Sequence, residues 1–112
     1  MATETMTAII AAQPGGAEVL TAVQRPVPQP GPGEVLLRVV SAGVNRPDIL
    51  QRNGMPPPPG CSDILGMEAA GVINALGAGV SELQAGMEVM ALRGGGGYGQ
   101  CGVVRAGLML EV

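Results

Sequence analysis

The stretch SAGVNRPDILQRNGMPPPPGCSDILGMEAAG, residues 41–71, holds most of the unusual residue choices in the chain and decides its fold. A β-rich segment leads into it and ends at Gly43. Asn45 then stands at the position of a helix N-cap, and Asp48 follows in the first turn, where a negative charge is favourable against the helix dipole. The stretch therefore predicts a helix that begins directly after Asn45.

This helix is predicted to be short. Asn53 and Gly54 supply the left-handed residue that ends a helix, and the four prolines at positions 56–59 predict an extended exit. A strand is expected to resume after Gly66. We interpret the whole stretch as one wall of an active site.

Short strands separated by Gly and Pro turns are predicted on both sides of this stretch. The proline-rich segment 25–33 predicts a surface crossover, with a ligand for an SH3-type domain as the functional alternative. Many short strands with one small helix favour a mainly β, largely antiparallel barrel or sandwich. The strands are predicted at residues 5–12, 18–24, 34–41, 69–76, 87–92, 98–104 and 108–112.

The glycine run at residues 94–99, GGGGYG, matches the dinucleotide fingerprint G-x-G-x-x-G on paper. That fingerprint requires a helix directly after it, whose N-terminal amides hold the pyrophosphate. The residues that follow, QCGVV, favour a strand instead. The run is therefore predicted to be a tight glycine hairpin, with nucleotide binding as the alternative.

Charge and composition exclude several functions. The net charge of -3 and a pI near 4.7 are unfavourable for a nucleic-acid partner, which needs clustered basic residues. The chain has no Lys and no His, so it supplies neither an imidazole metal ligand nor an imidazole base. Two alternative explanations of this composition are a coding bias toward Gly, Ala, Pro and Arg, and a deliberately altered sequence.

The same features predict a cytoplasmic protein. Cys61 and Cys101 lack C-x-x-C spacing, which excludes a zinc knuckle, and no secretory context supports a disulfide. The first residues lack the basic region of a signal peptide, and no segment is long enough to span a bilayer. We therefore expect no membrane partner.

Three segments carry a family resemblance: GVNRPDILQRNG, PPPPGCSDILGMEAAG and GGGGYGQCGVVRAG. They resemble the N-terminal, GroES-like domain of the medium-chain dehydrogenase/reductase superfamily, and within it the zinc-independent NADPH:quinone oxidoreductases. The similarity runs over residues 6–112. It implies a partly open β-barrel with one or two short helices, forming a single substrate-side domain over residues 1–112. In the family a Rossmann domain with the NADPH fingerprint follows, so the chain is expected to be truncated.

The resemblance also assigns a substrate and cofactor cleft to Asn45, Asp48, Met67 and Glu68. In zinc-dependent relatives a Cys lies in the region of Asn45 and a His at the position of Met67. Asn45 and Met67 replace both metal ligands here, so no zinc is expected. By resemblance Asn45 lines the nicotinamide side of the cleft, Asp48 fixes its turn, and Glu68 is a buried, hydrogen-bonded structural acid or a catalytic one.

The resemblance implies hydride transfer from NADPH to a quinone or enone, with little activity expected from this chain alone. No certain catalytic residue is assigned. The Tyr that family members carry just before the proline run, facing the substrate, is missing here, which argues against substrate stacking at that place. The alternative from another class is a noncatalytic β-domain for protein interaction. In that reading, uncovered strand edges would drive self-association.

Overall fold

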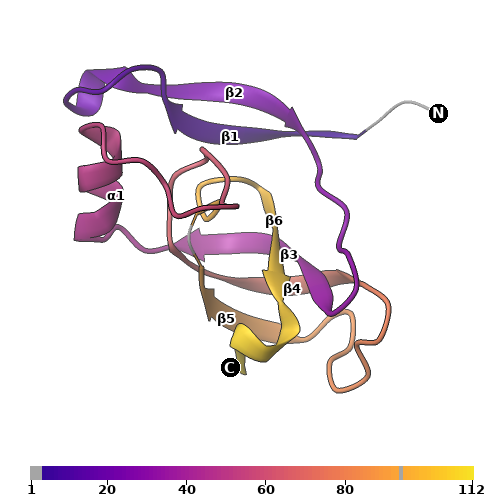
Figure 1. Cartoon of the computed structure of the whole chain (residues 1–112). Coiled ribbons are helices and arrows are strands. Elements are labelled where there is room, and N and C mark those ends of the chain that lie inside the picture. Colours follow the sequence, from indigo (N-terminus) through magenta and orange to yellow (C-terminus); the bar gives the residue numbers. More distant parts are fainter. Residues whose placement is uncertain (1–3, 94) are drawn as a thin grey trace.

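The computed structural model describes residues 4–93 and 95–112. Figure 1 shows a two-stranded hairpin lying over a larger sheet, with the helix at one end of the molecule. The elements are β1 (Thr5–Ala11), a 3-10 turn (Ala17–Val19), β2 (Leu20–Pro26), β3 (Glu34–Ala42), α1 (Arg46–Arg52), β4 (Glu68–Leu76), β5 (Glu88–Leu92), β6 (Cys101–Arg105), a second 3-10 turn (Ala106–Leu108) and β7 (Met109–Glu111).

The larger sheet has five strands in the order β6-β3-β4-β5-β7, and every pair is antiparallel. Strand β3 is central, and its register with β4 shifts between Val39 and Ser41. Gly71 lies opposite this shift, where an added Cβ would collide with the carbonyl oxygen of Arg38. Only glycine therefore lets the two backbones approach this closely at the bulge.

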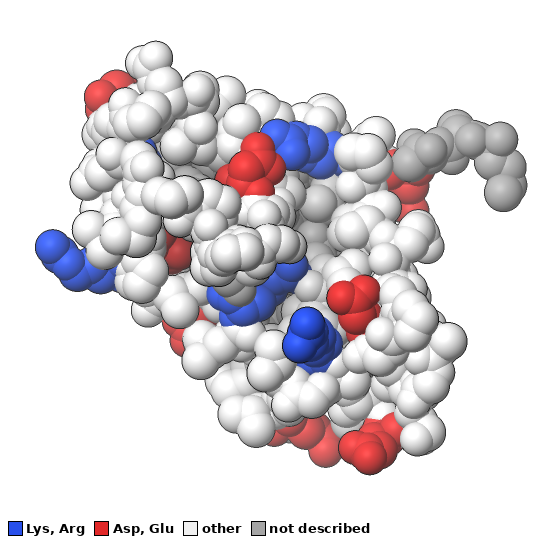
Figure 2. Space-filling view, in the orientation of Figure 1, with Lys and Arg blue, Asp and Glu red and all other residues white. Residues whose placement is uncertain are grey.

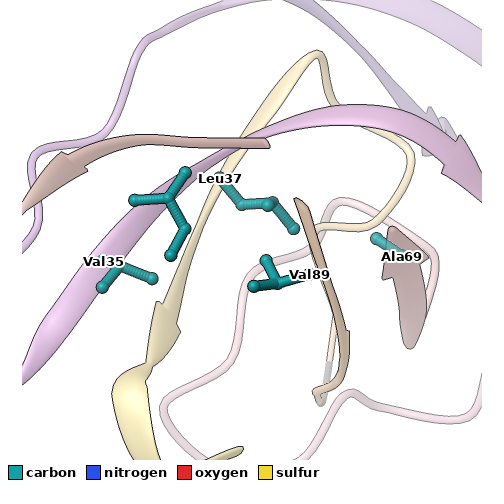
Figure 3. Packing of buried hydrophobic residues seen from close by; sticks show 5 residues of the cluster. Val35, Leu37, Ala69 and Val89 are labelled. Carbon is teal, nitrogen blue, oxygen red and sulfur yellow. The ribbon is translucent and has the colours of Figure 1, made fainter. Parts of the chain in front are cut away.

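Aliphatic side chains of the three middle strands form the main core, which we call the sheet core (Figure 3). Its buried members are Val35, Leu37, Ala69, Ile73 and Val89. These residues alternate along their strands, as expected for one buried face of a pleated sheet. Leu36, on the opposite face of β3 from Val35 and Leu37, is buried as well.

A smaller cluster joins the hairpin to the larger sheet, and we call it the seam. Met6, Ala8 and Ile64 are its buried members, and Tyr98 and Cys101 pack against them. The main chain closes the same junction, because the Ile9 N–H donates to the Tyr98 carbonyl at 3.0 Å. These contacts make the fold a partly open barrel with one α-helix among the described residues, which confirms the predicted fold class.

The prediction that the glycine run is a tight hairpin is wrong. Strands β5 and β6 lie at different places in the sheet, so residues 95–99 cross between them instead of folding back. Gly97 donates its N–H to the Gly66 carbonyl at 2.8 Å, and Tyr98 donates to that of Leu65 at 2.9 Å. A Cβ on Gly97 would lie 2.8 Å from the Gly66 oxygen, so the crossing requires glycine. Gly94, the first residue of the predicted run, lies outside the described residues.

The other predicted strands are present with small shifts at their ends. Strand β2 extends to Pro26, so the proline-rich crossover begins later than predicted. A 3-10 turn takes the place of the start of the second predicted strand. Strand β6 begins at Cys101, because Tyr98 belongs to the crossing segment. No helix of the described residues has the length and apolar character needed to cross a lipid bilayer.

Candidate functional site

The start of helix α1 anchors the candidate site. Asn45 is its N-cap, with an extended backbone at φ -127° and ψ 160°. The Asn45 N–H donates to Oδ2 of Asp48 at 3.0 Å, as in a capping box. Asp48 is 6% exposed, so its carboxylate is held in the interior by this contact and the next. The predicted N-cap and the predicted end of the helix at Asn53 and Gly54 are both confirmed.

Tyr98 supplies the second contact to the buried carboxylate. Its hydroxyl donates to Oδ2 of Asp48 at 2.9 Å and lies 3.2 Å from the Gly43 carbonyl. Because a hydroxyl has one proton, the shorter contact to the charged oxygen takes it. Burial, followed by the hydrogen bond and the charge of Asp48, raises the pKa of Tyr98 to about 12. Tyr98 is therefore a neutral donor over the whole physiological range.

Glu68 connects the helix start to strand β4. Its Oε2 accepts a hydrogen bond from the Asn45 side-chain amide at 2.9 Å, and its carbonyl accepts one from the Gly43 N–H at 3.1 Å. An added Cβ on Gly43 would collide with the Glu68 carboxylate, so glycine makes room for it. Glu68 is exposed, which corrects the expectation of a buried acid. Glu68 is the first residue of β4, and its carboxylate contacts the N-cap of the helix instead of the core.

We call Gly43, Asn45, Asp48, Glu68 and Tyr98 the cap network. The structure brings three of the four expected cleft residues into this network by hydrogen bonds. Met67 is the exception. It is half-buried and its carbonyl accepts the Arg93 N–H at 2.7 Å, so its main chain faces the end of β5.

Sequence reasoning missed Tyr98 as a site residue. Its hydroxyl reaches Asp48 across 50 positions of sequence, a distance that no local pattern reports. One signal was present, because Tyr98 is the only aromatic residue in the 112-residue chain. A buried Tyr hydroxyl normally requires a polar partner, and the lone Tyr was the natural place to look for one.

An apolar groove borders the cap network. It has a volume of about 720 Å³ and is bounded on one side by Gly43 and Glu68. The opposite side is formed by exposed side chains of β5, the second 3-10 turn and β7. These are Met90, Leu92, Leu108 and Leu110. Glu68 is its one charged lining residue among the described residues, and no arginine lines it.

The donor set around the groove is a poor one for a metal. Within residues 4–93 and 95–112, no three His, Cys, Asp or Glu side chains cluster so that they could hold an ion. Neither Cys61 nor Cys101 lines the groove, and both are free thiols. Burial raises the pKa of the Cys101 thiol, with Glu4 adding to the effect, so this group is a weaker thiolate ligand than usual.

Comparison with known proteins gives one matching family. The alcohol dehydrogenase GroES-like domain matches residues 31–110. The synaptic vesicle membrane protein VAT-1 homolog of Rattus norvegicus is 43% identical over 88 residues, which cover 73% of this chain and 21% of that protein. Quinone oxidoreductase 1 of Escherichia coli is 38% identical over 76 residues, which cover 68% of this chain and 23% of that protein.

Solved structures agree over nearly the whole chain. The human synaptic vesicle membrane protein VAT-1 homolog-like protein superposes with a TM-score of 0.89 at 26% identity, covering 97% of this chain and 36% of that one. A quinone oxidoreductase of Pseudomonas syringae superposes with a TM-score of 0.85 at 31% identity, covering 96% and 33%. The chain thus spans only between a fifth and a quarter of the two curated relatives.

Proposed function

The chain belongs to the alcohol dehydrogenase GroES-like domain family, and we propose that it forms the substrate side of an NADPH-dependent oxidoreductase acting on a quinone or enone. The observation that carries the proposal is the apolar groove with Glu68 at its edge, where the Glu68 carboxylate accepts a hydrogen bond from the Asn45 side-chain amide behind it. Quinones and enones are flat and largely apolar, with a carbonyl oxygen that needs a donor. The groove and its polar edge match both parts of such a molecule.

The groove fits one end of NADPH and not the other. A nicotinamide ring is apolar and carries one carboxamide, for which the Asn45 side chain provides an amide partner. The phosphates need Lys, Arg or a helix N-terminus that offers its amides, and no arginine lines the groove. The residues described here therefore suit the nicotinamide end, and the phosphates would be bound outside this groove.

The chain's own residues would act by orientation. The Glu68 carboxylate accepts one hydrogen of the Asn45 side-chain amide, which leaves the second hydrogen of that nitrogen as a donor for a carbonyl oxygen of the substrate or of the cofactor's carboxamide. The Asp48 carboxylate holds the Asn45 backbone N–H, and the Tyr98 hydroxyl in turn donates to Asp48. When bound, NADPH supplies the hydride, so the protein's part is to place the ring and to exclude water from it.

The proposed reaction needs no zinc. By resemblance, Asn45 and Met67 stand where zinc-dependent members of the medium-chain dehydrogenase/reductase superfamily carry their Cys and His ligands. A carboxamide and a thioether are poor replacements, because zinc in proteins is bound by thiolate, imidazole or carboxylate groups. We also expect these 112 residues alone to turn over little NADPH, since the groove offers no cation to the phosphates.

The test compares Asn45→Ser with Asn45→Ala in the chain fused to the Rossmann domain of a related reductase. Serine keeps a good N-cap and removes the amide, whereas alanine removes both. If the amide positions the cofactor, both variants lower kcat/KM for NADPH-dependent quinone reduction by about tenfold or more, a loss of about 1.4 kcal/mol. Only Asn45→Ala should lower the melting temperature clearly. An Asn45→Ser variant with unchanged kcat/KM would contradict the role of the amide.

A second candidate is a noncatalytic β-domain that associates through its apolar surface. The exposed side chains of Met90, Leu92, Leu108 and Leu110 favour it, because contiguous exposed apolar residues mark interaction sites. The edge strand β7 adjoins them. Sedimentation over a range of concentrations separates the two candidates: self-association lost in Leu110→Glu would favour this one, and a monomer at all concentrations would exclude self-association.

A further inference from the structure

A second pocket, separate from the groove, lies between the hairpin and strand β6. Its volume is about 260 Å³, and it shares no lining residue with the groove. Apolar side chains form most of the wall, among them Met6, Pro26 and Ile64. Figure 2 shows basic side chains gathering near the centre of this face, around a hollow between the hairpin and the larger sheet. We call this space the Arg93 pocket.

The Arg93 guanidinium is held in the pocket by two glycines. A Cβ on Gly96 would lie 3.1 Å from its Cζ, and a Cβ on Gly102 would lie 2.9 Å from its Nη1. A side chain at either position would therefore crowd the guanidinium and push it aside. The Arg93 backbone is fixed as well, because its N–H donates to the Met67 carbonyl at 2.7 Å. The guanidinium thus lies against Gly96 of the crossing segment and Gly102 of β6.

This guanidinium lacks a partner in the part of the chain that the structure describes. Its Nη1 is buried and makes no hydrogen bond there, and no described carboxylate lies within ion-pair distance. Burial lowers the pKa of Arg93, while the charges of Cys61 and Glu34 act against that from farther away. An arginine stays charged in proteins, so the charge cannot be relieved by losing a proton.

The other arginine of the pocket is a useful contrast. Arg25 makes a two-pronged contact with Asp63, at 3.0 Å from Nη1 to Oδ1 and 2.9 Å from Nη2 to Oδ2. It is therefore satisfied at the rim of the pocket. Arg93 presents the same forked group in a more buried place without such a carboxylate. Arg93 is half-buried and has no carboxylate partner among the described residues, so an anion bound in the pocket would offset the partial desolvation of its charge.

We propose that the Arg93 pocket binds a small organic carboxylate, with its carboxylate on the Arg93 guanidinium and its apolar body against Met6, Pro26 and Ile64. A guanidinium and a carboxylate match in a planar, two-pronged geometry. The volume lies just below the range of about 300–1,000 Å³ typical of drug-sized ligands, which restricts the ligand to a small acid. Among the described residues that line the pocket, Arg93 is the one arginine without a carboxylate partner, which favours one negative charge over the two of a phosphate. This site goes beyond the proposed oxidoreductase function and does not depend on it.

The test is a calorimetric titration of the 112-residue chain with benzoate, benzamide and inorganic phosphate. Benzamide has the shape of benzoate without its charge, and phosphate has charge without an apolar body. We expect saturable binding of benzoate, with both other compounds weaker by about tenfold or more. Equal binding of benzamide would overturn the role of the charge, and stronger binding of phosphate would overturn the role of the apolar wall. The absence of benzoate binding would overturn the proposal as a whole.

Two variants locate the site. Arg93→Gln removes the charge and should weaken benzoate by about tenfold or more, whereas Arg46→Gln, on the exposed start of α1, should leave it unchanged within about twofold. Gly102→Ala keeps the charge and crowds Nη1, so it should weaken benzoate as well. Circular dichroism verifies that each variant is folded. If both pocket variants bind benzoate as the unchanged chain does, the proposal is wrong.

Discussion

The sheet core and the seam are built from different kinds of side chain. The sheet core contains only aliphatic side chains, and Val35, Leu37, Ile73 and Val89 are its largest fully buried members. The seam has three buried residues, and the residues packed against it include an aromatic ring with a hydroxyl, which the surroundings of the sheet core lack. The sheet core can only contribute burial, whereas the seam also orients polar groups. The candidate site therefore depends on the smaller of the two clusters, through Tyr98.

The largest expected effect comes from emptying the sheet core. Ile73→Ala should lower the free energy of unfolding by about 4 kcal/mol, and Ile64→Ala in the seam by about 2 kcal/mol. The difference is expected because Ile64 already borders the Arg93 pocket, so its removal enlarges an existing space. Urea unfolding followed by circular dichroism measures both. Ile49→Ala, on an exposed face of α1, is the control and should change stability by about 0.5 kcal/mol or less. Equal losses at positions 73 and 64 would show that the two clusters are equivalent.

The next effect concerns the hydroxyl that links the seam to the site. Tyr98→Phe keeps the ring and leaves the buried Asp48 carboxylate with one donor fewer, which should cost about 2 kcal/mol of unfolding free energy. A double-mutant cycle with Asp48→Asn tests whether the two groups act together. A coupling energy near zero would mean that the hydroxyl does not support the carboxylate, and the link between seam and site would be lost.

Alkaline pH gives a smaller and more specific effect. The pKa of Tyr98 is raised from its ordinary value of 10.0 to about 12, so folding favours the neutral phenol. Its contribution is fully present below pH 10 and is lost as the pH rises toward 12. Because Tyr98 is the only Tyr and Trp is absent, the ultraviolet absorbance of the phenolate reports this group alone. Between pH 10 and pH 12, the free energy of unfolding should therefore fall less in Tyr98→Phe than in the unchanged chain. A phenolate titration centred at the ordinary value would contradict the buried hydrogen bond.

The smallest effect is expected from the ion pair at the rim of the Arg93 pocket, next to the seam. Asp63→Asn removes the ion pair with Arg25, whose two side chains are 36% and 58% exposed. The hydrogen bond from Arg25 lowers the pKa of Asp63, so its contribution is present above the ordinary value and is lost as the pH falls through the lowered one. Asp63→Asn should lower the melting temperature less than Tyr98→Phe does. At high salt, the melting temperatures of Asp63→Asn and the unchanged chain should become equal. A lower melting temperature of Asp63→Asn that persists at high salt would point to a packing role for Asp63.

Much of the local structure could be predicted from the chain alone. The N-cap at Asn45, the acid at Asp48 and the Asn53-Gly54 ending set the bounds of α1, because capping acts over three or four residues. The strands followed from alternation and from Gly and Pro turns, with errors only at their ends. The family resemblance also pointed to Asn45 and Glu68, which the structure then joined by a hydrogen bond.

What the chain alone did not decide were the pairings between distant segments. The glycine run was predicted to fold back because a local pattern reports flexibility and not direction, and only the strand order shows that it crosses the sheet. Tyr98 and Asp48 meet across 50 positions, and Arg93 lies between Gly96 and Gly102 only once β6 has paired with β3. The sequence by itself determined the short helix, the strands and the family. The tertiary structure decided the partner of Tyr98, the exposure of Glu68 and the pocket around Arg93, because these depend on which backbones pack together.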